Sequence, residues 1–350
     1  MSVLAIDAGT TGVTAVVVSA TGDIVAKHST GEAQRRLDSN PSDIDRPLWD
    51  ALAQAGLLAA AAPESIGGDG YGILEATSIT IELGRGLAAV PFVASTTAAG
   101  AIAEFGSPEQ QLQWARAATT GASILTVALD DSPLRPATAL TSVDSAPVAD
   151  GILLARESGA VLLKSTDPGV TVTTQQAVDN RSIGMVEFDS TAFDSSRTIE
   201  SADLARWVRM RVTLGTCAYQ VGVLEEALRV TAEYARERVQ FGKPIGSFQA
   251  VAQRLADAYI DVKGARLTMW QAAWALSAGL DGDEEVAVAK FWAAEAGHRV
   301  AHTLVHVHGG VGLDRDHPVH RYFLAAKRAE FAYGGATAAL RRLGSALASA

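Results

Sequence analysis

The sequence has little cysteine, less basic than acidic charge and no long uninterrupted apolar run. Its 350 residues include one cysteine, Cys217, so no disulfide can form within the chain, which fits a reducing compartment such as the cytoplasm. Aspartate and glutamate number 39 against 29 lysines and arginines, which gives a net charge of −10. Because nucleic acids and anionic membranes attract positive surfaces, this balance argues against both as partners.

Signals for membrane insertion and export are also missing. The most apolar stretch, residues 87–103, is interrupted by Pro91 and is short for a membrane span. The first residues include Asp7 and lack the basic residues of a secretory leader. With 48% hydrophobic residues, the chain is nevertheless apolar enough to fold into two or three packed units. We therefore expect a soluble, cytoplasmic protein.

The spacing of apolar residues divides the chain into four segments. Residues 1–29 hold β-branched runs around Gly-rich turns and predict a strand hairpin, whereas residues 30–121 change to a helical period. Residues 122–200 contain short apolar runs separated by Asp, Pro, Gly and Ser, which predict a small β domain. Residues 201–350 predict an antiparallel bundle of four long helices. These helices are expected at about 203–236, 247–278, 283–308 and 318–347.

Three long motifs follow one another in the sequence. They are LWDALAQAGLLAAAAPESIGGDG at 48–70 with IELGRGLAAVP at 81–91, ERVQFGKPIGSFQAVAQRLAD at 237–257, and LVHVHGGVGLDRDHPVHRYFLAAKRAEFAYG at 304–334. In this order they resemble the acyl-CoA dehydrogenase family over about residues 40–350. The resemblance implies a mainly α fold with a helical domain, a central small β domain and a C-terminal four-helix bundle. It also implies FAD as the cofactor.

The second and third motifs suit a diphosphate. Arg238 carries a planar, fixed cation, and the Gly309–Gly310 pair lets backbone N–H groups approach phosphate oxygens. In the family these elements hold the ADP half of FAD, often across a subunit interface. The resemblance therefore assigns cofactor contacts to Arg238, Phe241, Gln249, His306, Gly309 and Gly310. His306 stands where the family usually has Gln, and it can still donate a hydrogen bond.

Two other interpretations of these motifs must be weighed. Arg238 could pair with a carboxylate while the glycines only turn the chain. Histidines 298, 302 and 306 lie four residues apart on one helical face, a spacing that also suits a metal. Because no acidic or cysteine ligand accompanies them, we expect no metal site.

The flavin-ring side of the family's site is incomplete in this sequence. The family places a segment of the form Thr-Glu-Pro-x-x-Gly-Ser-Asp near the flavin, followed by a strand with a tryptophan. The corresponding stretch here, TVALDDSPLRPATAL at 126–140, lacks the Gly-Ser-Asp element, and residues 122–200 contain no tryptophan. We expect these differences to weaken binding of the isoalloxazine ring in this chain's own cleft.

The family's catalytic base is missing as well. Acyl-CoA dehydrogenation needs a positioned base to remove the α proton, and the family uses glutamate. Its two known positions fall at or near Val212 and at Tyr333, and the latter lies in a turn, AYGGAT at 332–337. Neither residue is acidic. The nearest carboxylate, Glu330, is expected on a solvated helix surface. The sequence therefore assigns no catalytic residue to this chain.

This combination resembles one subunit type of heteromeric acyl-CoA dehydrogenases, known for CoA thioesters of steroid side chains. The resemblance implies an oxidoreductase of lipid metabolism and steroid degradation, a flavoprotein heterotetramer in which a homologous partner subunit carries the base. Such an enzyme introduces an α,β double bond into an acyl-CoA substrate, and this chain alone is expected to be inactive. Two alternatives remain: a homomeric dehydrogenase with an unusual base such as Glu330, and a non-catalytic scaffold of the same fold.

The N-terminal segment points elsewhere. Its IDAGTTGVTAVVVSATGDIVA resembles the first phosphate loop of sugar kinases of the actin-like ATPase superfamily, with Asp7 near the metal. That fold needs a second phosphate loop and an adenosine loop, and neither is found from residue 40 onward. We interpret residues 1–28 as a fused or mis-started segment rather than an ATP site; an ATP-dependent kinase is the remaining, disfavoured alternative.

Overall fold

A computed structural model describes residues 3–9, 12–18, 24–29, 36, 38–40, 43–130, 138–189 and 195–349. The contacts group the chain into two compact units. The first is built mainly from Val13–Ala76 and Ala88–Val212, and the second mainly from Thr77–Leu87 and Thr213–Ala350. Across the described residues, no helix is long and apolar enough to cross a membrane. The division of the chain at residues 121/122 and 200/201 stays a prediction.

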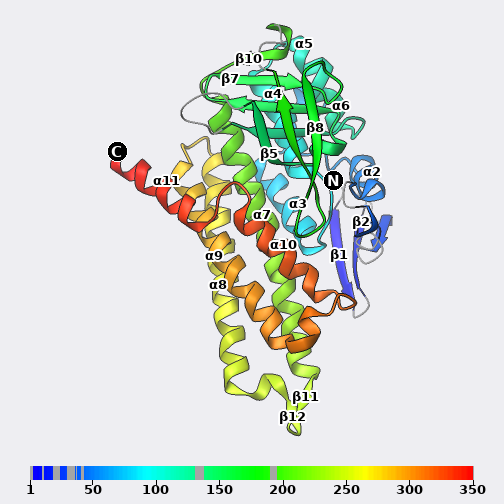
Figure 1. Cartoon of the computed structure of the whole chain (residues 1–350), viewed down its shortest axis with the longest axis vertical. Coiled ribbons are helices and arrows are strands. Elements are labelled where there is room, and N and C mark those ends of the chain that lie inside the picture. Colours follow the sequence, from blue (N-terminus) through cyan, green and yellow to red (C-terminus); the bar gives the residue numbers. More distant parts are fainter. Residues whose placement is uncertain are drawn as a thin grey trace. The chain divides into compact units, whose positions relative to one another are not determined.

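The N-terminal segment forms a three-stranded sheet in the order β1-β2-β3 (Figure 1). The strands are β1 (Val3–Gly9), β2 (Gly12–Val18) and β3 (Ile24–Ser29), and β2 pairs with β3 in antiparallel register. Strands form where a hairpin was expected from the β-branched runs. The Asp7 side chain and Thr10–Thr11 lie outside the described residues, so the interpretation that this segment is not an ATP site stays a prediction.

Short helices follow the N-terminal sheet, and residues 77–85 among them belong to the second unit. Asp45 caps α2 (Arg46–Gln54) by accepting a hydrogen bond from the Leu48 N–H, and α2 buries Leu48, Trp49 and Leu52. A reciprocal Ser107–Gln110 capping box starts the next helical segment after α4. The other helices are α3 (Ile73–Arg85), α4 (Phe92–Phe105), α5 (Pro108–Gln110), η2 (Gln111–Ala115) and α6 (Arg116–Thr119).

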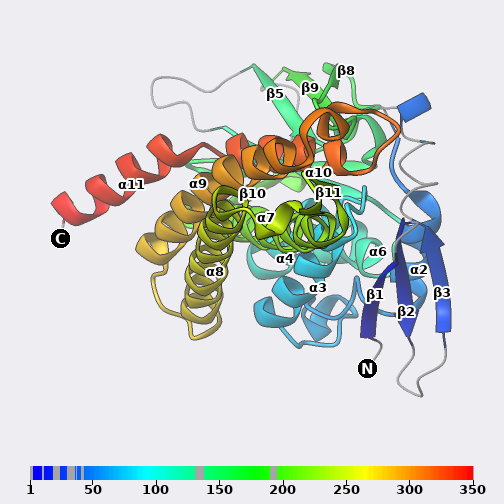
Figure 2. The ribbon, with the colours of Figure 1, turned by 90° about the horizontal axis from the view of Figure 1, so that it is seen from below.

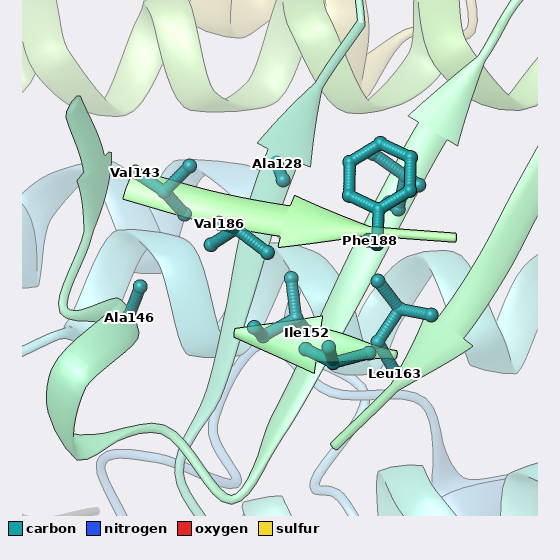
Figure 3. Close-up of a cluster of buried hydrophobic side chains, with 9 residues drawn as sticks. Ala128, Val143, Ala146, Ile152, Leu163, Val186 and Phe188 are labelled. Carbon is teal, nitrogen blue, oxygen red and sulfur yellow. The ribbon is translucent and has the colours of Figure 1, made fainter. Parts of the chain in front are cut away.

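The β domain holds a four-stranded sheet, β10-β7-β6-β4, and a three-stranded sheet, β5-β9-β8. Figure 3 shows Val143, Val186 and Phe188 of the smaller sheet facing Ala128, Ile152 and Leu163 of the larger one. Burial alternates along β9, so one face of that strand enters this core. The strands are β4 (Leu125–Leu129), β5 (Ala139–Asp144), β6 (Gly151–Arg156), β7 (Gly159–Leu163), β8 (Val170–Gln176), β9 (Ser182–Phe188) and β10 (Thr198–Glu200).

Long helices lie side by side in the C-terminal bundle (Figures 1 and 2). The elements are α7 (Leu204–Glu237), the hairpin strands β11 (Val239–Gln240) and β12 (Lys243–Pro244), α8 (Gln249–Ser277), α9 (Asp283–His308), η6 (Gly309–Leu313), α10 (Val319–Phe331) and α11 (Ala336–Ser349). The mainly helical fold with a small β domain is therefore confirmed.

One expected helix is wrong in its extent. The sequence predicts a single helix over 318–347, whereas the chain breaks it at residues 332–335 into α10 and α11. Tyr333 has φ of 54° and Gly334 has φ of 100°, both in the left-handed region. A right-handed helix cannot pass through such residues, so the turn is a fixed change of direction.

One buried polar side chain connects three helices in the bundle core. The Gln220 amide on α7 donates to the carbonyl oxygens of Ala293 on α9 (3.4 Å) and Ala326 on α10 (3.1 Å). A Cβ at position 297 would lie 1.9 Å from Gln220 Nε2, so Gly297 provides the space for this brace. Three helices are thus joined through one amide.

Candidate functional site

Two of the sequence motifs meet at one end of the bundle. The Tyr234 ring near the end of α7 stacks on the His308 ring at the end of α9, with centroids 4.3 Å apart. Arg238 follows one turn after Tyr234, whose carbonyl oxygen accepts from the Arg238 backbone N–H, and Gly309 follows His308 directly. Helix packing therefore brings the Arg-x-x-Phe-Gly turn and the Gly-Gly turn to the same end of α7 and α9.

The turn after α7 presents its side chains outward. Arg238 is exposed, and within the described residues its guanidinium forms no ion pair. Phe241 has φ of 54° and is 92% exposed, with its ring edge-to-face to Phe248. The Lys243 ammonium lies 4.5 Å from the Phe248 ring centroid, and Gln249, the first residue of α8, is exposed. A cation and an aromatic ring are thereby exposed beside each other in this turn.

The two glycines of the Gly-Gly turn differ in whether the backbone conformation requires glycine. Gly309 has φ of 60°, a conformation that other residues adopt only with strain. Gly310 has no positive φ, and among the described residues nothing lies within 4 Å of a Cβ added there. By contrast, a Cβ on Gly312 would lie 2.9 Å from the Val305 carbonyl oxygen. Folding explains Gly309 and Gly312 but leaves Gly310 and the open space beside it unexplained.

The histidines near this turn divide into exposed and buried residues. His306 is exposed, as a ligand contact requires. His308 is 4% exposed, and its Nδ1 hydrogen-bonds the Leu304 carbonyl oxygen at 2.8 Å. Burial lowers the pKa of His308 below its ordinary value, so the ring stays neutral at physiological pH. The sequence did not indicate the stacking role of His308; its place directly before the Gly-Gly pair was the available signal.

The remaining histidines on α9 lie in a different environment. The His298 and His302 rings are 4.7 Å apart, and His298 Nδ1 lies 3.4 Å from a Glu330 carboxylate oxygen. In the part of the chain that the structure describes, no group of three or more histidine, cysteine, aspartate or glutamate residues could hold a metal ion. These histidines are explained by contacts with their neighbours.

The two positions for a base carry no acid. Val212 is completely buried, and Tyr333 is partly exposed with its carbonyl oxygen 3.5 Å from an Arg342 nitrogen. Neither side chain is a carboxylate that could accept a substrate proton at neutral pH. The absence of a catalytic base from this chain stays a prediction.

Glu330 is not the solvated surface residue that the sequence suggested. It is 8% exposed because α10 turns this side chain toward α9. One carboxylate oxygen accepts a hydrogen bond from Lys327 at 2.6 Å, and the other faces His298. Since both oxygens face cationic or polar groups of the chain itself, this carboxylate is poorly placed to remove a proton from a substrate.

The comparisons with known proteins identify the family of the chain. Residues 207–347 match the family model "Acyl-CoA dehydrogenase, C-terminal domain", and residues 9–122 match "Acyl-CoA dehydrogenase, N-terminal domain". The chain is 51% identical to "Acyl-CoA dehydrogenase FadE27" of Mycobacterium tuberculosis, covering 93% of this chain and 94% of that protein.

Solved structures give the same result. A chain of the "ChsE4-ChsE5 complex from Mycobacterium tuberculosis" superposes with a TM-score of 0.87 at 51% identity, covering 91% of this chain and 92% of that one. A chain of the "Tcur3481-Tcur3483 steroid ACAD G363A variant" superposes with a TM-score of 0.83 at 33% identity, covering 91% and 94%. The motif resemblance is therefore confirmed, and the chain belongs to the acyl-CoA dehydrogenase family of FAD-dependent oxidoreductases.

Proposed function

We propose that this chain is a subunit of a heteromeric acyl-CoA dehydrogenase in which a homologous partner chain carries the catalytic base. The main support is the combination of an open ADP-side element with non-acidic residues at both base positions. Val212 and Tyr333 offer no carboxylate, and the contacts of Glu330 to Lys327 and His298 keep it from serving instead. In this proposal the chain binds and orients, and the partner removes the proton.

The ADP half of FAD fits the open end of the bundle. The exposed Arg238 guanidinium would pair with the pyrophosphate, and the backbone at Gly309 and Gly310 would approach its oxygens. Phe241, Gln249 and His306 complete the proposed contacts. When bound, FAD supplies the acceptor for the hydride that leaves the acyl β carbon. Since these groups are exposed, we propose that a second subunit covers the cofactor held there.

An apolar stripe on α8 supports association with a second helical subunit. Ile260, Leu267 and Trp274 are 67%, 70% and 58% exposed and follow one another at intervals of seven residues. This spacing places them on one side of the helix, as in helices that pack against another helix. Exposed apolar side chains in such a row are typical of an interface.

The substrate class is the second part of the proposal. One similar structure is the ChsE4-ChsE5 complex, and another is a steroid ACAD, the Tcur3481-Tcur3483 variant. These relatives support the CoA thioester of a steroid side chain as substrate and an α,β double bond as the product. We propose a heterotetramer in the cytoplasm as the working form.

Purification with and without a homologous partner tests this function. We expect flavin absorbance and acyl-CoA turnover with an artificial electron acceptor only when both chains are present. Flavin colour and turnover in this chain alone would show a homomeric enzyme with its own base. A complex with neither colour nor turnover would show a scaffold that keeps the fold without the chemistry.

A further inference from the structure

Three aromatic rings meet at the end of the bundle where α7 and α9 finish. The Tyr234 ring on α7 stacks on the His308 ring on α9, with centroids 4.3 Å apart and ring planes inclined by 23°. The His308 ring also contacts the His317 ring, in the segment between η6 and α10, with centroids 5.6 Å apart. The rings therefore connect two helices to the segment that leads into a third.

The stacked rings lie next to the groups that we assign to the diphosphate. His308 directly precedes Gly309 and Gly310 in the chain. On the other helix, the Arg238 backbone N–H donates to the Tyr234 carbonyl oxygen at 2.9 Å. Each ring is thus attached to one of the two turns, and the contact between the rings holds those turns together.

The His308 ring is also fixed by its own helix. Its Nδ1 lies 2.8 Å from the Leu304 carbonyl oxygen, and because a carbonyl oxygen only accepts, Nδ1 donates its hydrogen there. A Cβ added to Gly312 would lie 3.2 Å from the His308 Cβ, so the turn after α9 folds back against this residue. A ring held by a hydrogen bond and by close packing keeps one orientation.

The rings carry no charge that would oppose the stack. Burial lowers the pKa of His308 and of His317 below the ordinary value, so both rings are neutral at physiological pH. From α7 the ionisable side chain that faces His308 is Tyr234, and from the loop it is His317, which itself lies near Asp314 and His320. Two neutral imidazoles and a phenol stack without mutual repulsion.

Burial by itself does not account for aromatic rings at this place. The neighbouring buried positions Leu304 and Val307 on α9 are aliphatic. An aliphatic side chain at position 308 would fill the same space, whereas two flat rings contact each other in a preferred relative orientation. The stack therefore supplies a defined placement of the end of α7 relative to the end of α9.

We propose that Tyr234 and His308 are positioning residues for FAD, because their stack holds Arg238 and the Gly309–Gly310 backbone where both reach one diphosphate. His317 completes the stack from the segment before α10. Binding is favoured because the two turns are already in place before the cofactor arrives. The inference rests on the proposed ADP-side contacts, and it holds whichever chain carries the base.

Flavin titration tests this role in the FAD-binding form of the protein, whether that is this chain or its complex with a homologous chain. We expect His308→Ala to lower FAD affinity about tenfold, because the turns lose their fixed placement. His308→Phe keeps a ring for Tyr234 and is expected to stay within about threefold of wild type. The matched control is His302→Ala on the same helix, with an expected change of less than about twofold. The His302 ring contacts His298 and Phe323 instead.

A double-mutant cycle identifies the stack as the cause. Tyr234→Leu is expected to lower FAD affinity by about the same factor as His308→Ala, and the double variant by little more than either, since both remove one contact. Amide hydrogen exchange without FAD is expected to rise at residues 309–312 in both single variants and to stay unchanged in His302→Ala. Should His308→Ala fail to fold, His308→Leu fills the space without a flat ring and takes its place.

The outcomes separate this inference from the proposed function. Wild-type FAD affinity in His308→Ala, with weakened affinity in Arg238→Ala, overturns the positioning role and leaves the ADP-side contacts standing. An equal loss in His308→Phe and His308→Ala overturns the stack as the cause, because a ring alone would then not suffice. Wild-type affinity in Arg238→Ala removes the proposed contact of Arg238 and with it the route by which the stack acts. Turnover enters none of these measurements, so the location of the base does not affect them.

Discussion

The two ends of the C-terminal bundle differ in what their charged groups contact. At the end formed by the last turns of α7 and α9, the exposed Arg238 forms no ion pair among the described residues, and open space adjoins Gly310. At the other end, Lys290 is bound to two carbonyl oxygens and Glu330 faces Lys327 and His298. The charged group at the first end is therefore exposed, whereas the charged groups at the second end contact other groups of the chain.

This contrast shows how the chain could serve an enzyme without performing the proton transfer. A base must reach its substrate with a free carboxylate, and the residues near the turn after α10 satisfy each other instead. A phosphate-binding element needs an uncommitted cation and accessible backbone, which the opposite end provides. The following predictions test this division, from the largest expected effect to the smallest.

Gly310→Glu is expected to affect FAD binding most. Because nothing described lies within 4 Å of a Cβ there, the free energy of unfolding should change by less than about 0.5 kcal/mol. A carboxylate beside the pyrophosphate should lower FAD affinity of the complex on the order of 100-fold through repulsion. Flavin titration and thermal unfolding measure the two effects. Gly310→Ala is the matched control; equal flavin retention in both variants would place the phosphates elsewhere.

Arg238→Ala should have the next largest effect. Loss of one charge-assisted contact costs roughly 1.5–3 kcal/mol, which is about tenfold or more in FAD affinity. Flavin retained by the complex after desalting measures this loss. Arg236→Ala is the control, since Arg236 is also exposed and lies in the last turn of α7. A wild-type flavin content in Arg238→Ala would reject the assignment.

The buried Lys290 predicts that the stability of the fold depends on pH. Burial lowers the pKa of Lys290 to about 8 from an ordinary value of 10.5. Between these values the unfolded chain holds a proton that the folded chain lacks, so the free energy of unfolding rises with pH. Burial raises the pKa of Cys217 from 9.0 to about 11, which has the opposite effect above pH 9.

The window from pH 8 to 9 therefore isolates Lys290. We expect wild type to gain about 1 kcal/mol across it relative to Lys290→Met, which lacks the titrating group. Denaturant unfolding of the two proteins at pH 7.5, about 8 and about 9 gives the comparison. Parallel pH curves for the two proteins would mean that the ammonium is not buried as described.

The smallest effect is expected from Glu330→Gln and Tyr333→Phe. Turnover of the two-chain complex should stay within about threefold, because neither residue is the working base. Steady-state kinetics with an acyl-CoA panel measures it, and the matching glutamate variant of the partner is the comparison. A loss on the order of 10²–10⁴-fold in Glu330→Gln would assign the proton transfer to this chain.

The long helices were the most predictable part of the fold. The start and end of α9 coincide with the predicted range 283–308, since its helical period is uninterrupted and a glycine follows. The predicted helical range 318–347 missed the break between α10 and α11, although the family resemblance placed a turn at 332–337. Helical periodicity continues on both sides of such a turn, so the apolar pattern alone does not reveal the turn.

The candidate site was predictable by residue type and less so by environment. Arg238 and the Gly-Gly pair were found through motifs, and their exposure agrees with the assigned contacts, which stay a proposal. The environment of Glu330 was predicted wrongly because burial depends on α9, which lies far away in the sequence. Likewise the stacking of Tyr234 on His308 joins residues on two helices, and no local pattern encodes it.

Close contact with the amide of Gln220 makes substitutions at positions 220 and 297 depend on each other. An alanine at 297 would collide with that amide, and a shorter residue at 220 would leave the space beside Gly297 empty and the three helices without their shared donor. Neither position can change first without loss of packing or of hydrogen bonds. We expect natural relatives to carry these two residues together or to replace both, so the pair marks which sequences share this bundle interior.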